Sequence, residues 1–185
     1  MTAREQDEYS ALRATIRERG TARVCVFAGG IAAWAAATIA TAALASTPVA
    51  TLLPLLVLAS VFEAVFALHV GVERIGRYLQ VFHEPGRSDA AGGSEGCAGW
   101  EHAAMSFGRP TGAATTDALF TVPFVLASLF NAVPALMLGP ARVELVFVGG
   151  AHALFVLRLL VARQAAGKQR AIDLQRFREI KNGPR

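Results

Sequence analysis

Five polar side chains lie within otherwise apolar segments of this 185-residue chain, and they have the greatest capacity for chemistry. They are Glu63, His69, Asn131, His152 and Arg158. An ionisable group inside a membrane span costs roughly 2.5–3.5 kcal/mol on insertion, so each one needs a partner or a function. One interpretation makes the acid, the amide and the histidines a proton or ion path. We favour the other, in which they lock helices together, because a path needs polar groups at every depth.

Depth along the helix axis indicates which of these residues can meet. Glu63 lies 14 residues into the second apolar segment and Arg158 lies 15 residues into the fourth. Both are therefore about 21–23 Å from the same membrane edge and are predicted to form an ion pair, unless Arg158 extends to the cytoplasmic surface instead. Asn131 and His152 both lie about 10–14 Å from that edge, which predicts a hydrogen bond between neighbouring helices.

The segments that position these residues are long enough to cross a bilayer. Residues 24–62 contain no charged side chain, and residues 118–143 contain only Arg142. A helical span needs about 20 apolar residues. The chain is therefore predicted to be an all-α integral membrane protein with four transmembrane helices in two hairpins, over residues 25–45, 49–71, 117–138 and 143–162.

The distribution of Lys and Arg predicts the orientation. Five arginines precede the first span, four lie in the central stretch and seven basic residues follow the last span, whereas the two short turns hold only Arg142. Both termini and the central stretch are therefore expected in the cytoplasm. The predicted parts are an amphipathic helix (1–24), a hairpin (25–71), a helix extension with a mobile loop (72–116), a second hairpin (117–162) and a basic amphipathic tail (163–185).

The predicted cytoplasmic segments suggest two kinds of partner. The tail has seven basic and two acidic side chains, a net charge of +5, which fits anionic lipid headgroups. Its expected apolar face is Ile172, Phe177 and Ile180. Nucleic acid is not predicted as a partner, because no basic groove studded with aromatic residues accompanies the charge.

An apolar stripe continues past the second span and is predicted to dock other protein subunits. It consists of Val72, Ile75, Leu79 and Phe82. Glu73 and Arg77 have the spacing of an i, i+4 ion pair on the same helix. The helix is expected to continue without a break until Pro85 stops it.

Small residues recur every four positions in the first span. They are Gly29, Ala33, Ala37 and Thr41. Such a stripe allows close approach of another helix. Trp34, in mid-span, is expected to pack against protein rather than lipid.

No catalytic or cofactor motif accompanies these features, so neither an enzyme, a cofactor nor a metal site is predicted. The pairs His83-Glu84 and Glu101-His102 lack the i, i+3 or i, i+4 histidine spacing of metal sites. His69 and His152 differ in depth by about 17 Å and cannot ligate one haem iron within a protomer.

Three motifs resemble a pattern in uncharacterised four-span bacterial membrane proteins: "EYSALRATIRERG", "ERIGRYLQVFHE" and "GWEH". The resemblance covers the N-terminal helix, the first hairpin and the loop, and it implies no known activity. The order of charged helix, hairpin and amphipathic helix is also similar to that of small membrane effectors in bacterial nucleotide-signalling defence systems.

The expected function is that of a non-enzymatic membrane subunit or scaffold, which anchors a larger complex at the cytoplasmic face of a bacterial inner membrane. The alternative is an oligomeric channel or pore-forming effector, in which the polar residues of the spans line a shared path.

Overall fold

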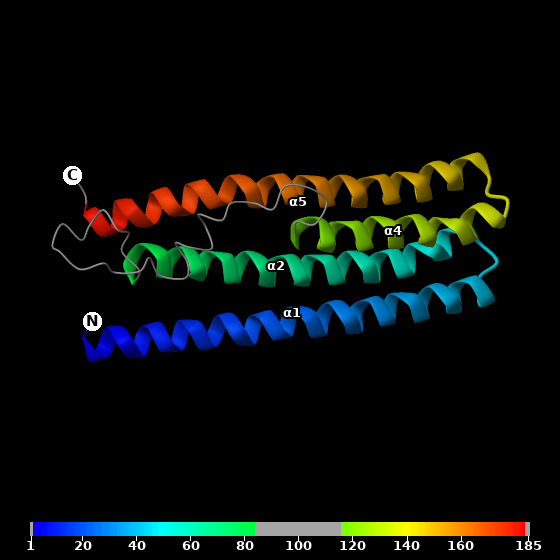
Figure 1. The fold of residues 1–185 in the computed structure, drawn as a ribbon. Coiled ribbons are helices and arrows are strands. Elements are labelled where there is room, and N and C mark those ends of the chain that lie inside the picture. The colour runs from blue at the N-terminus through cyan, green and yellow to red at the C-terminus, as the bar shows by residue number, and fades with distance from the viewer. Residues whose placement is uncertain (1, 84–115, 184–185) are drawn as a thin grey trace.

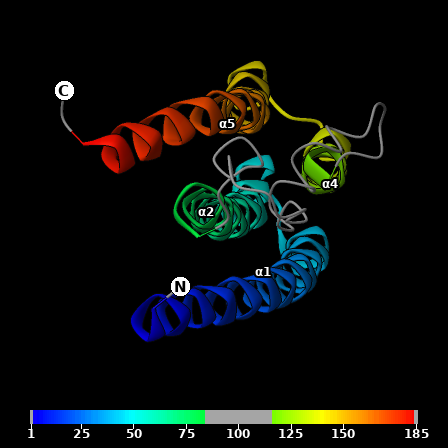
Figure 2. The same ribbon diagram turned by 60° about the vertical axis from the view of Figure 1, so that its left-hand side comes forward.

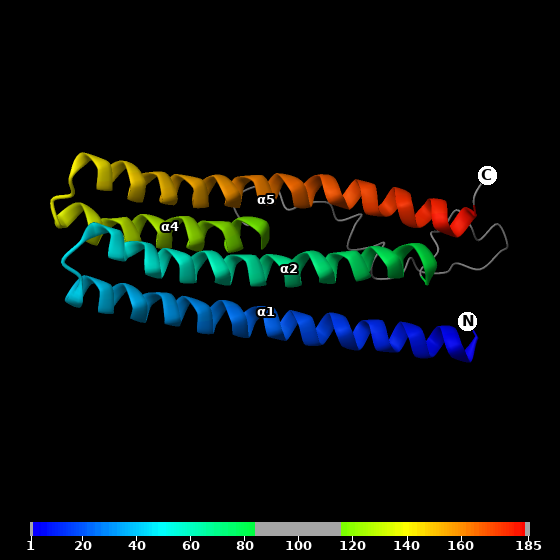
Figure 3. The same cartoon turned by 180° about the vertical axis from the view of Figure 1, so that it is seen from behind.

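The computed structural model, which describes residues 2–83 and 116–183, is a bundle of helices with no strand in that part of the chain. The elements are α1 (Ala3–Leu44), the short 3₁₀ turn η1 (Pro48–Thr51), α2 (Leu52–Phe82), α4 (Thr116–Met137) and α5 (Arg142–Asn182). They lie side by side, with α4 shorter than the other three (Figure 1), and the view from behind in Figure 3 shows the same order.

Three of these helices are long and apolar enough to cross a membrane: α1, η1 with α2, and α5. The apolar stretch of α4, Thr121–Met137, is shorter than these three and is not among the helices long enough to cross. The described residues are thus all-helical, as predicted, and three of their helices could span a membrane. The predicted mobile loop, Glu84 and the Glu101-His102 pair lie outside the described residues.

The helices do not break where the predicted parts meet. A capping box starts α1, in which Thr2 Oγ1 accepts from the Glu5 backbone N–H and the Glu5 carboxylate accepts from the Thr2 N–H. From there α1 runs on for 42 residues without interruption. The boundaries drawn at 24/25 and 162/163 therefore fall inside continuous helices. The predicted continuation of α2 past residue 71 is observed as far as Phe82.

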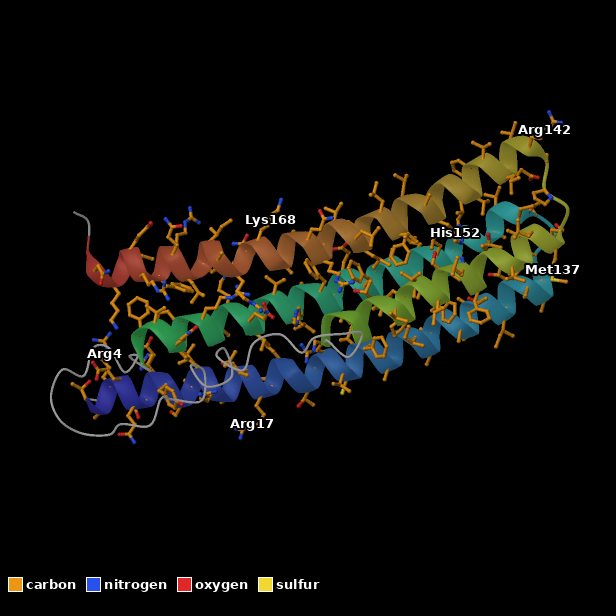
Figure 4. All side chains as sticks on the ribbon, turned by 45° about the horizontal axis from the view of Figure 1, so that its top comes forward. Arg4, Arg17, Met137, Arg142, His152 and Lys168 are labelled. Carbon is orange, nitrogen blue, oxygen red and sulfur yellow. The ribbon has the colours of Figure 1, made fainter. Side chains whose placement is uncertain are left out.

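The short turns lie together at one end of the bundle. Figure 4 marks Met137 and Arg142 at this end and Arg4 at the opposite end. Gly139 turns the chain between α4 and α5 with φ +65°, a left-handed conformation that favours glycine. The Glu144 carboxylate then accepts from the Ala141 backbone N–H and starts α5.

The core is built around one phenylalanine from each helix: Phe27, Phe62, Phe124 and Phe155. Phe62 and Phe124 meet edge to face with centroids 5.3 Å apart, and Phe27 and Phe155 extend the cluster at 5.8 and 6.2 Å. Trp34 packs against this cluster, as expected from its mid-span position. In the turned view of Figure 2, α2 lies between α1 and α5, with α4 to one side.

Candidate functional site

The polar residues singled out from the sequence fall into separate layers along the bundle. The first layer is Glu63 on α2 and Arg158 on α5, which the structure brings together. Arg158 Nε lies 2.8 Å from Glu63 Oε1, and Arg158 Nη2 donates to Glu63 Oε2 at 2.8 Å. The two-point contact is the strongest geometry available to this pair. The Arg158 guanidinium also lies 5.7 Å from the centroid of the Phe66 ring.

The second layer is Asn131 on α4 and His152 on α5, which also meet. Asn131 is fully buried, and its Nδ2 lies 2.9 Å from the Thr51 carbonyl oxygen and 3.1 Å from His152 Nε2. His152 Nδ1 lies 2.8 Å from the Val148 carbonyl oxygen. A carbonyl can only accept, so Nδ1 carries the proton and Nε2 accepts from the asparagine. Asn131 thereby ties α4 to both α5 and the η1 turn.

His69 belongs to neither layer. Its Nδ1 lies 3.0 Å from Arg23 Nη1 on α1, and its Nε2 lies 3.5 Å from Glu73 Oε1 one helical turn further along α2. Among the described residues, therefore, the predicted polar groups do not line up as a chain of hydrogen bonds through the bundle. Apolar rings of the core, including those of Phe62 and Phe124, pack between the helices that carry the polar residues.

Beyond the apolar segments, three helices continue together as what we name the stalk: residues 3–23 of α1, 72–82 of α2 and 163–182 of α5. Inside it lies a charged network that the sequence did not reveal. Arg77, 1% exposed, donates to Asp173 Oδ2 at 2.7 Å and also pairs with Glu73, as its i, i+4 spacing predicted. Asp173 itself is 6% exposed.

Further donors surround these two carboxylates. Arg170 Nη2 lies 2.7 Å from Glu73 Oε1, Gln169 Nε2 donates to Asp173 Oδ1 at 2.8 Å, and Arg74 Nε lies 3.4 Å from Asp173 Oδ2. The network thus ties α2 to α5 through buried charges that are paired and hydrogen-bonded.

The electrostatics of the stalk favour its charged form. Burial alone would raise the pKa of Asp173, but the hydrogen bond from Gln169 and the charges of Arg74 and Arg77 outweigh it and hold that pKa below its usual value. On the α1 side, Tyr78 Oη donates to Glu8 Oε1 at 2.7 Å, and this bond raises the pKa of Tyr78.

The three residues predicted as the apolar face of the tail do not share one environment, because Phe177 is half-buried against the Tyr78 and Phe82 rings. Ile172 and Ile180 are exposed, whereas Asp173 is the side chain of this turn that points inward. The signal that could have found it is compositional: Asp173 is one of only two acidic residues in the basic tail. An isolated acid at helical spacing from Gln169 and Phe177 is suited to meet a buried arginine.

The predicted docking stripe is largely covered by the protein's own helices. Leu79 is 0% exposed, and Phe82 stacks on Tyr78 with centroids 4.6 Å apart and meets the Phe177 ring of α5 at 6.3 Å. Val72 and Ile75 are half-buried. The stripe therefore fills the stalk interior, and Leu79 in particular is not accessible to a partner.

The small-residue stripe is also offset from the contact it was expected to make. A Cβ on Gly29 would meet nothing within 4 Å, and Ala33 is exposed, whereas Ala37 and Thr41 are half-buried. The close approach occurs one residue later: a Cβ on Gly30 would lie 2.4 Å from both Val61 methyl carbons.

A small cavity of about 50 Å³ opens beside the first layer, at the end of the apolar segments. It lies between α2, α4 and α5, and its walls are mostly apolar, with His69 and Arg163 among the lining residues. No cluster of three or more His, Cys, Asp or Glu side chains suited to a metal occurs in residues 2–83 and 116–183. Comparisons of the chain with protein-family models, with curated proteins and with solved structures found no match.

Proposed function

We propose that this chain is a non-enzymatic membrane subunit of a bacterial inner membrane, which crosses the bilayer four times and holds a larger complex at the cytoplasmic face through its stalk. The observation that carries the proposal is the stalk itself. At 1.5 Å per residue, α1 and α5 are each about 60 Å long, roughly twice the 30 Å hydrocarbon core of a bilayer. Helix of this length outside the lipid needs a purpose beyond anchoring.

The four-span topology rests on length and charge. Helix α4 has 22 residues, about 33 Å, which matches the thickness of the hydrocarbon core. The basic residues gather at the stalk end, which favours the cytoplasm for both termini. The excess positive charge of residues 163–185 also fits contact with anionic headgroups where α5 leaves the lipid.

Two features of the stalk suit the binding of a protein partner. Its interior is closed by Leu79, Arg77 and Asp173, so its shape is fixed before a partner arrives. Its surface carries exposed charges of both signs on neighbouring turns, including Arg176, Arg178 and Glu179. Such a surface favours specific recognition over simple hydrophobic association.

The alternative, an oligomeric channel, would use the polar groups at membrane depth. Asn131 and His152 favour the locking interpretation instead, because their hydrogen-bonding atoms bind each other, nearby backbone carbonyls and the Thr38 hydroxyl of α1.

The topology is tested by labelling single cysteines in a Cys25→Ser/Cys97→Ser background with a thiol reagent that cannot cross membranes. Ser46→Cys and Leu138→Cys, both exposed in the short turns, should react from outside intact cells, and Arg176→Cys only after lysis. Reaction of Arg176→Cys in intact cells would show that the tail lies outside the cell and that the proposed orientation is wrong.

The scaffold role is tested by purifying the tagged chain from its own membranes in mild detergent and measuring native mass. We expect a second protein at fixed stoichiometry, which the stalk variant Arg176→Glu/Arg178→Glu loses and the opposite-end control Arg142→Glu keeps. A pure ring of this chain, with a conductance in liposomes that Glu63→Ala abolishes, would support the channel and contradict the scaffold.

A further inference from the structure

The Glu63–Arg158 pair differs from the Asn131–His152 pair in the same apolar part of the bundle, because it is open on one side. The Glu63 side chain is 49% exposed and that of Arg158 is 42% exposed, whereas Asn131 is fully buried and His152 is 9% exposed. The pair lies on the side of the α2–α5 contact that faces away from α4, since Phe62 and Leu159, one position away on each helix, are the residues that turn inward.

The open side of the pair lies at the depth where lipid tails are expected. Arg158 lies about 24 Å along α5 from its start and Glu63 about 17 Å along α2, both within the 30 Å core. The neighbouring side chains of the same outward face are apolar and exposed: Leu56 at 64%, Leu154 at 68% and Leu157 at 55%. A bidentate pair still leaves acceptor sites on the carboxylate and N–H donors on the guanidinium. In hydrocarbon these remaining groups need polar partners.

We propose that the partner is a second copy of the chain, and that Glu63 and Arg158 form the centre of a two-fold homodimer interface. The pair is self-complementary: the acid comes from α2, the base from α5, and both lie at one level of the bundle. Rotation by a half-turn about an axis normal to the membrane places Glu63 of one copy opposite Arg158 of the other, and the reverse. Four charges then satisfy one another in a closed cluster.

The surface of α2 around Glu63 permits the close approach that this cluster requires. Three small side chains on this side of α2 are exposed: Ser60 lies one turn before the carboxylate, Ala64 directly after it and Ala67 one turn after it. Small side chains at this spacing allow helix backbones to come near each other in a membrane. A lipid headgroup fits less well, because an anionic phosphate drawn to Arg158 would also meet Glu63.

The dimer rests on the proposed membrane topology but not on the scaffold role. Its test is a charge swap. The double variant Glu63→Arg/Arg158→Glu keeps the ion pair within each chain and keeps it self-complementary between two swapped chains. A mixed pair of wild type and swapped chain, however, sets acid against acid and base against base. This separates the contact between copies from the contact within one chain.

Wild-type and swapped chains carrying different tags are co-expressed, and cross-linked dimers are counted by tag. Random pairing would make half of all dimers mixed. We expect mixed dimers to be at least about tenfold rarer than self-dimers. A random proportion of mixed dimers, or a wild-type chain that stays monomeric in the membrane, would overturn the proposal. In the second case a lipid or another protein covers the pair.

An independent measurement covers the outcome in which the swapped chain fails to fold. In the Cys25→Ser/Cys97→Ser background, oxidation of membranes should link Ala64→Cys chains into covalent dimers. Leu129→Cys, equally apolar in surroundings but exposed on α4, should stay monomeric. Equal cross-linking at both positions would contradict the interface. The cysteine labelling of the termini reads out the topology separately, so failure of the dimer and failure of the membrane orientation are distinguishable.

Discussion

At the scale of single residues, Arg77 is the most constrained side chain of the stalk. It is 1% exposed, and its guanidinium is shared between Glu73 on its own helix and Asp173 on α5. A buried ion pair gains little over apolar packing when intact, but removal of one partner leaves an uncompensated charge in a poorly solvated site. The stability of the stalk therefore depends strongly on Arg77 remaining paired.

Replacement of Arg77 by Met should lower the free energy of unfolding by about 3–5 kcal/mol, because Asp173 loses its closest cation. Thermal unfolding in detergent measures the change. The exposed Arg178→Met is the matched control and should stay within about 0.5 kcal/mol of wild type. Adding Asp173→Leu to Arg77→Met should restore part of the loss. A double variant no more stable than the single one would show that packing, not charge, holds this site.

The sequence predicted two polar pairs correctly, because the helical rise per residue alone determines how deep each side chain lies. The rise per residue matched Glu63 with Arg158 and Asn131 with His152, and both pairs are present. It could not reveal Asp173 as the partner of Arg77. Their meeting depends on the rotation of α5 about its own axis, which tertiary packing sets and which a basic, weakly amphipathic tail does not encode.

At the scale of elements, the α1–α2 contact depends on Gly30 rather than on the predicted stripe. Residues four apart on an α-helix drift by about 40° per step, so Gly29 and Thr41 lie about 120° apart around the axis. A stripe of this period turns away from a straight neighbour. That rotation explains why its first members are exposed and its last ones half-buried. The spacing of small residues correctly indicated a close helix contact of α1, but not which face of α1 meets α2.

Two adjacent glycines offer a matched test of this contact. Gly30→Leu should push α1 away from α2, because its Cβ alone would come within 2.4 Å of Val61. We expect a loss of about 1–3 kcal/mol in unfolding free energy, as for other overpacked sites. Gly29→Leu, where a Cβ meets nothing within 4 Å, should be close to neutral in the monomer. Thermal unfolding of both variants measures the difference. Equal free energies of unfolding would contradict a close α1–α2 contact at Gly30.

At the scale of the whole molecule, the bundle has two halves held by different forces. One half is closed by apolar packing around Phe62 and Phe124, and the other by the charged network of the stalk. The sequence predicted both halves as helical and predicted that the three amphipathic segments would form a layer on one side. It could not predict the contacts inside that layer, because they join residues about 100 positions apart, such as Lys181 Nζ and the Val81 carbonyl.

Acid should therefore open the stalk before it affects the rest of the bundle. The pKa of Asp173 is lowered in the folded protein, so its contribution to stability is present above the usual aspartate pKa of about 3.9 and is lost as the pH falls below it. Spin labels at Ser10→Cys and Arg176→Cys should report a wider distance between α1 and α5 at low pH, with helix content unchanged.

The variant Asp173→Asn serves as the control for this titration. It lacks the group that titrates, so its label distance should not depend on pH through Asp173. If the variant opens over the same pH range as wild type, the acid response comes from another carboxylate.

The unbroken passage of α1, α2 and α5 from the apolar segments into the stalk makes each helix a lever. The 20 residues of α5 beyond Ala162 extend about 30 Å, so a tilt of about 10° at the membrane would move the tip by about 5 Å. Transmembrane helices tilt when bilayer thickness changes. Because Arg77 and Asp173 join two of the levers, and Tyr78 and Glu8 join the third, the tips move together. On the membrane topology proposed above, a change in lipid thickness would therefore shift the position of the stalk's charged surface.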